Sequence, residues 1–353
     1  MEYIKNNTLT KEKNMWVNQV KDWYRENKRD LLWRKKENQD FYSIWISEIM
    51  LQQTGVKTVE NYFIRFKKKW PTLELFYNAK IDDILFLWQG LGYYQRAKNI
   101  HKTLQILKRK KIRPTYEELV KLPGIGDYTA SSISAILNDE NNAVVDGNIK
   151  RIISRSFNIS SELRDFKKKI YLKAKELTPL KGNGDYCQAL MDIGSTICKP
   201  VNPKCEICPI FNLCSFQKYN TKNIKKNIKK KIFKEALVFF IEHKNEIFIQ
   251  KSDSNFLYGL MKFPTSNFEV VGDKGKKKLN YNVIENYGLN KYELIKFGHI
   301  KHKFTNFDLK LEIIKVNVNH KFYHPTGLWI NENDFFNYPF SKLMLKVFDK
   351  VLN

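Results

Sequence analysis

Three things are scarce in this sequence: cysteine, acidic residues and long apolar segments. Five of the 353 residues are cysteine, and we do not expect them to form structural disulfides in a cytosolic protein. The longest apolar run, residues 236–241, is far shorter than the roughly 20 residues that cross a membrane. The N-terminal stretch MEYIKNNTLTKEK lacks the apolar core of a signal peptide. We therefore expect a cytoplasmic protein without a membrane partner.

The shortage of acidic residues leaves a large positive charge. The 62 Lys and Arg residues outnumber the 37 Asp and Glu residues, which gives a formal net charge of +25 and an isoelectric point near 9.6. Such a charge suits a polyanion such as nucleic acid, although a genome-wide bias toward Lys and Asn would also produce part of it. With 42% hydrophobic residues the chain can bury a sizeable core, and its length predicts about two domains.

Amphipathic patterns of helical spacing recur through residues 1–217, where strand alternation is not convincing. We expect helices at residues 15–24, 42–53, 56–69, 81–89 and 96–108. These patterns predict an all-α first domain at residues 1–217.

The pattern changes after a lysine-rich segment. Residues 218–234 contain eight lysines and no acid, which is typical of an exposed linker, placed at residues 218–232. Apolar alternation follows, and we expect a β-hairpin at 236–250, further strands at 293–300 and 307–318, and a closing helix at 341–351. The sequence therefore predicts an α+β second domain at residues 233–353.

A glycine hairpin at residues 122–126, LPGIG, joins two expected helices at residues 115–121 and 128–137. Pro123 and Gly124 end the first helix, Gly126 permits a second bend, and Asp127 is the expected cap of the second helix. Free backbone N–H groups at a helix start, next to a glycine loop, can bind a phosphate. An ordinary helix–turn–helix corner would have the same pattern, so DNA binding and a structural turn both remain open here.

Two carboxylates stand out. Asp146 follows an apolar run in VVDGN, about 20 residues after the hairpin, and can point back toward whatever the hairpin holds. Glu48 lies in YSIWISEIMLQQT, a largely apolar helix, where loss of solvation would raise its pKa and make it a general acid near neutral pH. The alternative is an exposed Glu on the polar side of an ordinary amphipathic helix.

These motifs together resemble a known family. LPGIG, a helix of small residues and VVDGNIKR resemble the helix-hairpin-helix superfamily of DNA base-excision glycosylases, and SEIMLQQT resembles the signature helix of its MutY-type adenine glycosylases. The resemblance covers residues 15–217 closely and 233–350 loosely. Leu32 and Phe41 replace two prolines of the family pattern, which alters local turns and leaves the proposed chemistry untouched.

The resemblance implies roles for individual residues. Glu48 would be the catalytic acid and Asp146 would stabilise the positive charge on the sugar, with Tyr128 and Asn148 holding these carboxylates. The adenine pocket would be formed by Trp33, Arg34, Leu51 and Gln188. The DNA contacts would be Gln52, Gln53, Tyr93 (from GLGYY), Gly124 and Gly126. Asp192, near Gln188, is expected to support the structure.

The residue two positions after Gly126 distinguishes simple base removal from strand cleavage. Some members of the superfamily carry a lysine there, whose amine forms a Schiff base with the sugar. Here the residue is Tyr128, and a phenol cannot form an imine. The sequence therefore favours a monofunctional glycosylase over an endonuclease III-like glycosylase/lyase.

Four cysteines follow the spacing C-x6-C-x2-C-x5-C: Cys198, Cys205, Cys208 and Cys214. Four thiolates this close together indicate a metal or cluster site, and zinc sites usually contain paired C-x2-C units. The spacing resembles the loop at residues 198–214 that holds one 4Fe–4S cluster in these glycosylases, and zinc is the alternative. Cys187 lies in an expected helix and is interpreted as a buried structural thiol.

The C-terminal domain resembles the Nudix-like lesion-recognition domain of the family. FLYGLMKFP at residues 256–264 resembles one of its segments, and Mg²⁺-dependent hydrolysis is not expected because the glutamate-rich Nudix box is missing. The resemblance implies that Phe304, Thr305 and Asn306 form the loop that reads 8-oxoguanine. Asn306 stands where the family has His, which makes lesion selectivity less certain than adenine excision.

The sequence thus predicts a bacterial, nucleoid-associated, monomeric enzyme of base excision repair that binds double-stranded DNA. Its expected substrates are A:8-oxoguanine and A:G mispairs. Two alternatives stay open: a bifunctional glycosylase/lyase for oxidised pyrimidines, and a DNA-binding module without catalysis.

Overall fold

The computed structural model describes residues 2–218, 231–252, 257, 259–271, 281–289, 292–304 and 306–352. Its residues group into two compact units, one of Met1–Asn78 with Lys102–Lys225 and one of Ala79–His101 with Lys226–Asn353. Thr305 and most of the expected linker lie outside the described residues. None of the described helices combines the length and the apolar character that crossing a membrane requires.

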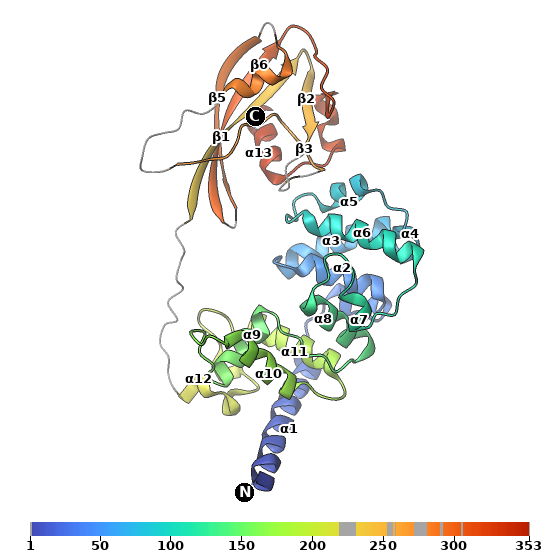
Figure 1. The fold of residues 1–353 in the computed structure, drawn as a ribbon, viewed down its shortest axis with the longest axis vertical. Helices are drawn as coiled ribbons and strands as arrows, with labels where there is room; N and C mark the ends of the chain where they lie inside the picture. The colour runs from blue at the N-terminus through green and yellow to red at the C-terminus, as the bar shows by residue number, and fades with distance from the viewer. Residues whose placement is uncertain are drawn as a thin grey trace. The chain divides into compact units, whose positions relative to one another are not determined.

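The first unit is helical (Figure 1). Its α-helices are α1 (Glu2–Asn27), α2 (Phe41–Leu51), α3 (Val56–Lys69), α4 (Leu73–Phe76), α7 (Tyr116–Leu119), α8 (Asp127–Asn138), α9 (Gly147–Ser156), α10 (Phe166–Leu177), α11 (Asn183–Thr196) and α12 (Ser215–Lys218). Short 3₁₀ turns are η1 (Leu32–Arg34), η2 (Lys36–Asn38), η3 (Cys205–Ile207) and η4 (Phe211–Leu213). Among the described residues, no strand precedes Ile232, as expected for residues 1–217.

The expected helices form with small differences at their ends, and α3 has the expected bounds. One detail was wrong: Asp127 does not cap α8. Gly126 is the N-cap, because its carbonyl accepts the first helical hydrogen bond from Ala130 N (2.9 Å). The Asp127 carboxylate instead accepts a hydrogen bond from the Tyr116 hydroxyl (2.9 Å) and so links α8 to α7.

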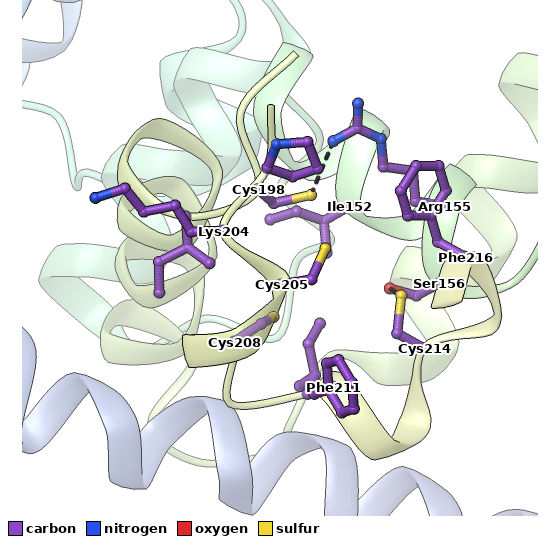
Figure 2. A pocket seen from close by; sticks show the side chains of 13 residues that line it. Ile152, Arg155, Ser156, Cys198, Lys204, Cys205, Cys208, Phe211, Cys214 and Phe216 are labelled. Carbon is purple, nitrogen blue, oxygen red and sulfur yellow. Dashed lines mark hydrogen bonds between the residues drawn. The ribbon is translucent and has the colours of Figure 1, made fainter. Parts of the chain in front are cut away.

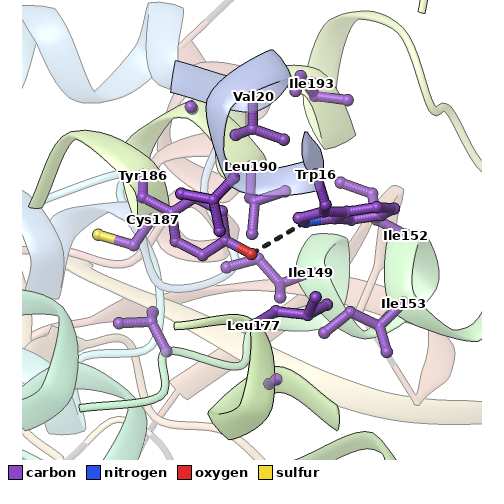
Figure 3. Close-up of a cluster of buried hydrophobic side chains, with 14 of the residues drawn as sticks. Trp16, Val20, Ile149, Ile152, Ile153, Leu177, Tyr186, Cys187, Leu190 and Ile193 are labelled. Carbon is purple, nitrogen blue, oxygen red and sulfur yellow. Dashed lines mark hydrogen bonds between the residues drawn. The ribbon is translucent and has the colours of Figure 1, made fainter. Parts of the chain in front are cut away.

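Helix α11 lies at the centre of one hydrophobic core. Its buried side chains pack against Trp16 and Val20 of α1 and against apolar residues of α9, as Figure 3 shows. Within this core the Trp16 Nε1 donates a hydrogen bond to the Tyr186 hydroxyl (3.0 Å). The indole and phenol are therefore buried without an unsatisfied polar group.

Two glycines let α11 approach its neighbours closely. A Cβ at Gly184 would lie 2.6 Å from the Ala135 carbonyl oxygen of α8, and one at Gly194 would lie 2.5 Å from the Asn148 Cβ of α9. Any larger residue at either position would push the elements apart. Helix α11 is thus held directly against the residues around Asp146.

The second unit contains a mixed seven-stranded sheet with the order β3-β2-β1-β6-β5, to which β4 and β7 add on β1 and β2. The strands are β1 (Ile232–His243), β2 (Glu246–Lys251), β3 (Met261–Lys262), β4 (Glu269–Val270), β5 (Tyr292–Lys303), β6 (Phe307–Val318) and β7 (Gly327–Asn331). Strands β1 and β6 pair in parallel, and the other pairs are antiparallel. The unit also contains α5 (Ile81–Trp88), η5 (Tyr281–Tyr287), η6 (Glu332–Asn337) and α13 (Lys342–Leu352), and α6 (Gln95–Arg109) has residues in both units.

The expected β1–β2 hairpin forms, with Lys244 in the left-handed region (φ 54°) at its turn. Leu343, Met344 and Val347 of α13 belong to the same buried hydrophobic cluster as residues of the sheet. The α+β prediction for this part of the chain is confirmed.

Candidate active site and cysteine cavity

A cavity of about 370 Å³ opens among η1, α2, α8, α11 and the start of α9. The eight residues expected to perform catalysis or to bind the base all line it: Trp33, Arg34, Glu48, Leu51, Tyr128, Asp146, Asn148 and Gln188. The fold thus brings together side chains from five elements that are spread over residues 33–188. The volume lies within the range typical of small-molecule sites.

Glu48 is buried in this cavity, with 6% of its surface exposed. Its helix α2 is buried from Tyr42 to Met50, so the alternative of an exposed Glu is wrong. Burial raises the pKa of Glu48 to about 7, and the nearby Ser132 and Tyr128 hydroxyls only partly offset this. The Tyr128 hydroxyl donates to Glu48 Oε2 (3.3 Å). Glu48 is therefore a carboxyl that can carry a proton near neutral pH.

Asp146 is the N-cap of α9. Its carboxylate accepts hydrogen bonds from Ile149 N (2.6 Å) and from Asn148 Nδ2 (2.8 Å). Burial raises the pKa of Asp146 above its ordinary value, whereas these hydrogen bonds lower it. The bonds fix both carboxylate oxygens, and the positive end of the helix favours the ionised form.

Arg151 connects Asn148 to the cysteine loop. Its Nη2 donates to Asn148 Oδ1 (2.8 Å) and to the Gly194 carbonyl (2.7 Å), and its Nε donates to the Cys198 carbonyl (2.8 Å). Asn148 is thus held between Asp146 and Arg151.

Asp192 holds Arg34 in the wall of the cavity. Its side chain is fully buried and forms ion pairs with Arg34 (2.7 Å) and Arg29 (2.5 Å). Burial opposes the ionisation of Asp192, but the two guanidinium groups keep its pKa below the ordinary value. The Nε of Arg34 is buried without a hydrogen-bond partner among the described residues.

Sequence reasoning missed several residues that line the cavity, among them Met191 and Ser195 of α11. Both lie on the helix face of Gln188, at positions i+3 and i+7. The helical spacing from Gln188 would have identified them.

Three of the five expected DNA contacts have a positive φ angle. Gln53 (φ 57°) and Tyr93 (φ 48°) adopt the left-handed region that side chains disfavour, and Gly124 has φ 79°. Gln52 Nε2 donates to Thr129 Oγ1 (3.1 Å), which orients its amide. Tyr93 belongs to the second unit and is 45% exposed. Such strain is often stored where a protein contacts a ligand.

Phe304 and Asn306 of the expected lesion-reading loop lie between β5 and β6, where Phe304 N donates to the Phe307 carbonyl (2.9 Å). The Phe304 ring is half-buried against Phe307 and His302, with centroids 4.6 Å apart in both pairs. Asn306 is exposed, and Thr305 lies outside the described residues. Asn306 therefore presents a polar side chain between these two strands.

Figure 2 shows a second cavity, lined by Cys198, Cys205, Cys208 and Cys214. The described side chains that line it include no carboxylate and no imidazole, and none of the four cysteines forms a disulfide. Arg155 Nη1 lies 3.4 Å from Cys198 Sγ, and Ser156 Oγ lies 3.5 Å from Cys214 Sγ. A set of four soft sulfur donors, two of which accept hydrogen bonds from α9, has the chemistry that an iron–sulfur cluster requires.

Comparison with known proteins identifies the family. Residues 46–179 match the model of the HhH-GPD superfamily base excision DNA repair proteins. The adenine DNA glycosylases of two Buchnera aphidicola strains, from Acyrthosiphon pisum and from Schizaphis graminum, are 38% and 35% identical to the chain. These alignments cover 85% and 88% of this chain and 85% and 91% of the relatives. The chain belongs to the adenine DNA glycosylase family.

Other comparisons agree with this family. Residues 198–214 match the iron-sulfur binding domain of endonuclease III, and residues 236–350 match the NUDIX domain. Among solved structures, a thermostable thymine-DNA glycosylase has a TM-score of 0.54 at 27% identity, over 60% of this chain and 98% of that chain.

The expected glycosylase family, the helical plus Nudix-like fold, and the enzyme class, a hydrolase of N-glycosyl bonds, are confirmed. The expectation of an iron–sulfur cluster as cofactor is confirmed, and the 4Fe–4S type stays a prediction. The domain boundaries and the roles of the individual residues in this adenine DNA glycosylase family member stay predictions.

Proposed function

We propose that the enzyme removes adenine mispaired with 8-oxoguanine or guanine by hydrolysing the N-glycosidic bond, and that it leaves the DNA strand intact. The observation that carries this proposal is the pair of carboxylates, the buried Glu48 and the half-buried Asp146, lining one cavity of suitable size. The names of the relatives with 35–38% identity support adenine as the base.

The first step is extrusion of the adenine from the duplex into the cavity, since the bond cannot be reached inside the base stack. Trp33 and Leu51 offer apolar contact surface, and Arg34 and Gln188 offer polar groups to the edge of the base. Arg34 is held by its ion pair with Asp192, so its side chain is fixed in place before the base arrives. Such preorganisation lowers the cost of positioning the substrate.

Glu48 then donates its proton to a ring nitrogen of the adenine, which makes the base a better leaving group. The C1′–N9 bond breaks with its electron pair moving to the base, and positive charge develops on the sugar. Asp146 stabilises this charge or captures C1′ covalently, as in retaining glycosidases. Water adds at C1′, its proton passes to the Glu48 carboxylate, and any bond between C1′ and Asp146 breaks with its electron pair returning to the carboxylate. Tyr128 and Asn148 hold the two carboxylates through the hydrogen bonds described above.

Strand cleavage is not part of the proposed reaction. A lyase needs an amine at C1′, and the described residues that line the cavity include no lysine. The alternative, a bifunctional glycosylase/lyase, predicts that borohydride traps an enzyme–DNA imine. We expect no trapping.

The protein would hold the duplex through the backbone N–H groups around Gly124 and Gly126 at the start of α8. Gln52, Gln53 and Tyr93 would enter the base stack and replace the stacking lost on extrusion. In the second unit, Phe304, Thr305 and Asn306 would read 8-oxoguanine opposite the adenine. Phosphate contacts by the many basic residues would make binding sensitive to salt.

The iron–sulfur cofactor is proposed to be one 4Fe–4S cluster held by Cys198, Cys205, Cys208 and Cys214. The four thiolates around one cavity support this assignment. When bound, the cluster would fix the loop against α9, and no step of base removal depends on its electrons. We also keep as proposals a monomeric state and a bacterial cytoplasmic location on the nucleoid.

Glu48→Gln tests this function directly. The variant keeps the size of the side chain and loses the transferable proton, so we expect base release to disappear while duplex affinity stays close to that of the wild type. Wild-type turnover by Glu48→Gln would exclude the mechanism. A wild-type protein that binds the duplex and never releases a base would favour the non-catalytic DNA-binding module.

A further inference from the structure

The C-terminal end of α8 contains an aspartate in a conformation that favours glycine. Asp139 is the C-cap of α8 with φ 56° and ψ 29°, in the left-handed region. This conformation costs an ordinary side chain about 1 kcal/mol or more, and helices commonly use glycine here. An aspartate at this position therefore suggests that its carboxylate makes a compensating interaction.

The carboxylate of Asp139 binds the start of a different helix, α11. It accepts hydrogen bonds from the backbone N–H groups of Gly182 (2.7 Å), Asn183 (2.5 Å) and Gly184 (3.3 Å). These groups carry the partial positive charge of the helix N-terminus. Asp139 thus ends α8 and caps α11 at the same time.

Asn183 completes the connection in the opposite direction. Its side chain is buried and donates from Nδ2 to the carbonyls of Glu140 (2.6 Å) and Asn142 (3.0 Å). These carbonyls lie on residues 139–145, the segment that leads from α8 to Asp146. Five hydrogen bonds therefore join this segment to the first turn of α11. We call these contacts the Asp139–Asn183 junction.

We propose that the Asp139–Asn183 junction positions two walls of the base pocket, and Asp139 is its positioning residue. One wall is α11, which carries Gln188, Met191 and the Arg34 partner Asp192. The other is the segment that ends in Asp146. The junction fixes the first turn of α11 to the start of the segment that ends in Asp146. Its loss therefore changes the distance between Asp146 and the pocket residues of α11. This inference rests on the proposed function.

The Asp139→Gly substitution distinguishes a role in positioning the pocket from a role confined to the turn at residue 139. Glycine removes the left-handed strain, and because Asp139 is exposed its replacement leaves no buried cavity. If Asp139 mattered only for its own turn, Asp139→Gly would match or exceed the wild type in stability. Asn158 is the matched control: it is also exposed and left-handed (φ 48°), in the turn after α9.

The readout is the single-turnover rate of adenine release at saturating enzyme, with the duplex dissociation constant measured in parallel. We expect Asp139→Gly to lower the rate by about tenfold or more, since small displacements of reacting groups have such effects, with duplex affinity within about twofold. We expect Asn158→Gly to match the wild type. Asp139→Asn keeps an acceptor oxygen and should fall between the two, and it serves as the test if Asp139→Gly does not fold. An unchanged rate in Asp139→Gly would overturn the proposal.

A second readout separates this proposal from the function on which it rests. The titration of Glu48 can be followed by its carboxyl ¹³C signal, assigned through Glu48→Gln. We expect Asp139→Gly, and not Asn158→Gly, to shift the midpoint of that titration, because Asp146 moves relative to Glu48. If the wild type releases no base, the proposed function fails, and the shift of the Glu48 midpoint still tests whether the Asp139–Asn183 junction positions the pocket. An unshifted midpoint in Asp139→Gly would contradict that role of the junction.

Discussion

Replacing Glu48 by glutamine should change how the stability of the helical part depends on pH. In the folded protein Glu48 keeps its proton up to a pKa of about 7, whereas its ordinary value is 4.5. Between these values the folded protein binds one proton more than the unfolded chain, so the free energy of unfolding falls as pH rises. The stabilisation of the folded state by this proton is fully present below pH 4.5 and is lost as pH passes 7.

The size of the effect follows from the interval between the two pKa values. Each pH unit corresponds to about 1.4 kcal/mol, so the wild type loses roughly 3 kcal/mol between pH 5 and pH 8 from this carboxyl. Glu48→Gln has no proton to lose at this site. Its stability relative to the wild type should therefore rise by roughly 3 kcal/mol over the same range. Any constant effect of the substitution cancels between the two pH values.

Urea unfolding at pH 5 and pH 8, followed by tryptophan fluorescence, measures this difference. Six of the seven tryptophans precede residue 90, so the signal reports mainly on the helical part. Glu117→Gln, at an exposed position of α7, is the matched control and should show no such pH-dependent gain. The same stability difference for Glu48→Gln at both pH values would refute the assignment of Glu48 as a buried acid with a raised pKa.

Three further results are expected. The single-turnover rate of base release should fall about tenfold per pH unit above pH 7, because Glu48 loses its proton. The rate should also fall in acid, because Asp146 gains a proton. A rate that stays constant above pH 7 would argue against Glu48 as the acid. Gly194→Ala should slow base release and destabilise the protein by about 1–3 kcal/mol in thermal unfolding, because the alanine Cβ would clash with Asn148. A wild-type rate would mean that α11 shifts to accept the alanine without displacing Asn148. Cys208→Ser should lower the iron content of the purified protein in chemical analysis, and the buried Cys187→Ser should not; equal iron content in both would exclude Cys208 as a ligand.

Patterns set by local spacing were predicted well from the sequence. The 3.6-residue period located α3 at its observed bounds, and alternating apolar residues located β6 at Phe307–Val318. Motifs with fixed spacing placed Glu48 and Asp146, because such motifs encode both the residue and the element that presents it. The meeting of these two residues in one cavity depends on how α2, α8 and α11 pack, and only the family resemblance indicated it.

Contacts between distant segments could not be read from local spacing. The parallel pairing of β1 with β6 joins strands about 70 residues apart, and no local pattern specifies it. The role of Asp139 was missed because Asn-Asp-Glu is typical of an ordinary turn. Its carboxylate accepts hydrogen bonds from the start of α11, more than 40 residues later in the sequence. Asp127 was assigned as a cap because its residue type favours that position, but the Gly126 carbonyl already begins the helix. In each case a tertiary contact decided the role of the residue.

The most direct test of the central claim is adenine release from a duplex with one adenine opposite 8-oxoguanine, with and without hot alkali afterwards. A monofunctional adenine glycosylase predicts strand breaks only after alkali, because the abasic product stays intact until it is heated in base. Comparison with guanine opposite the adenine then tests the proposed role of Asn306. Breaks without alkali would contradict the argument from Tyr128 and point to a lyase amine, and the absence of base release under all conditions would contradict the enzymatic account.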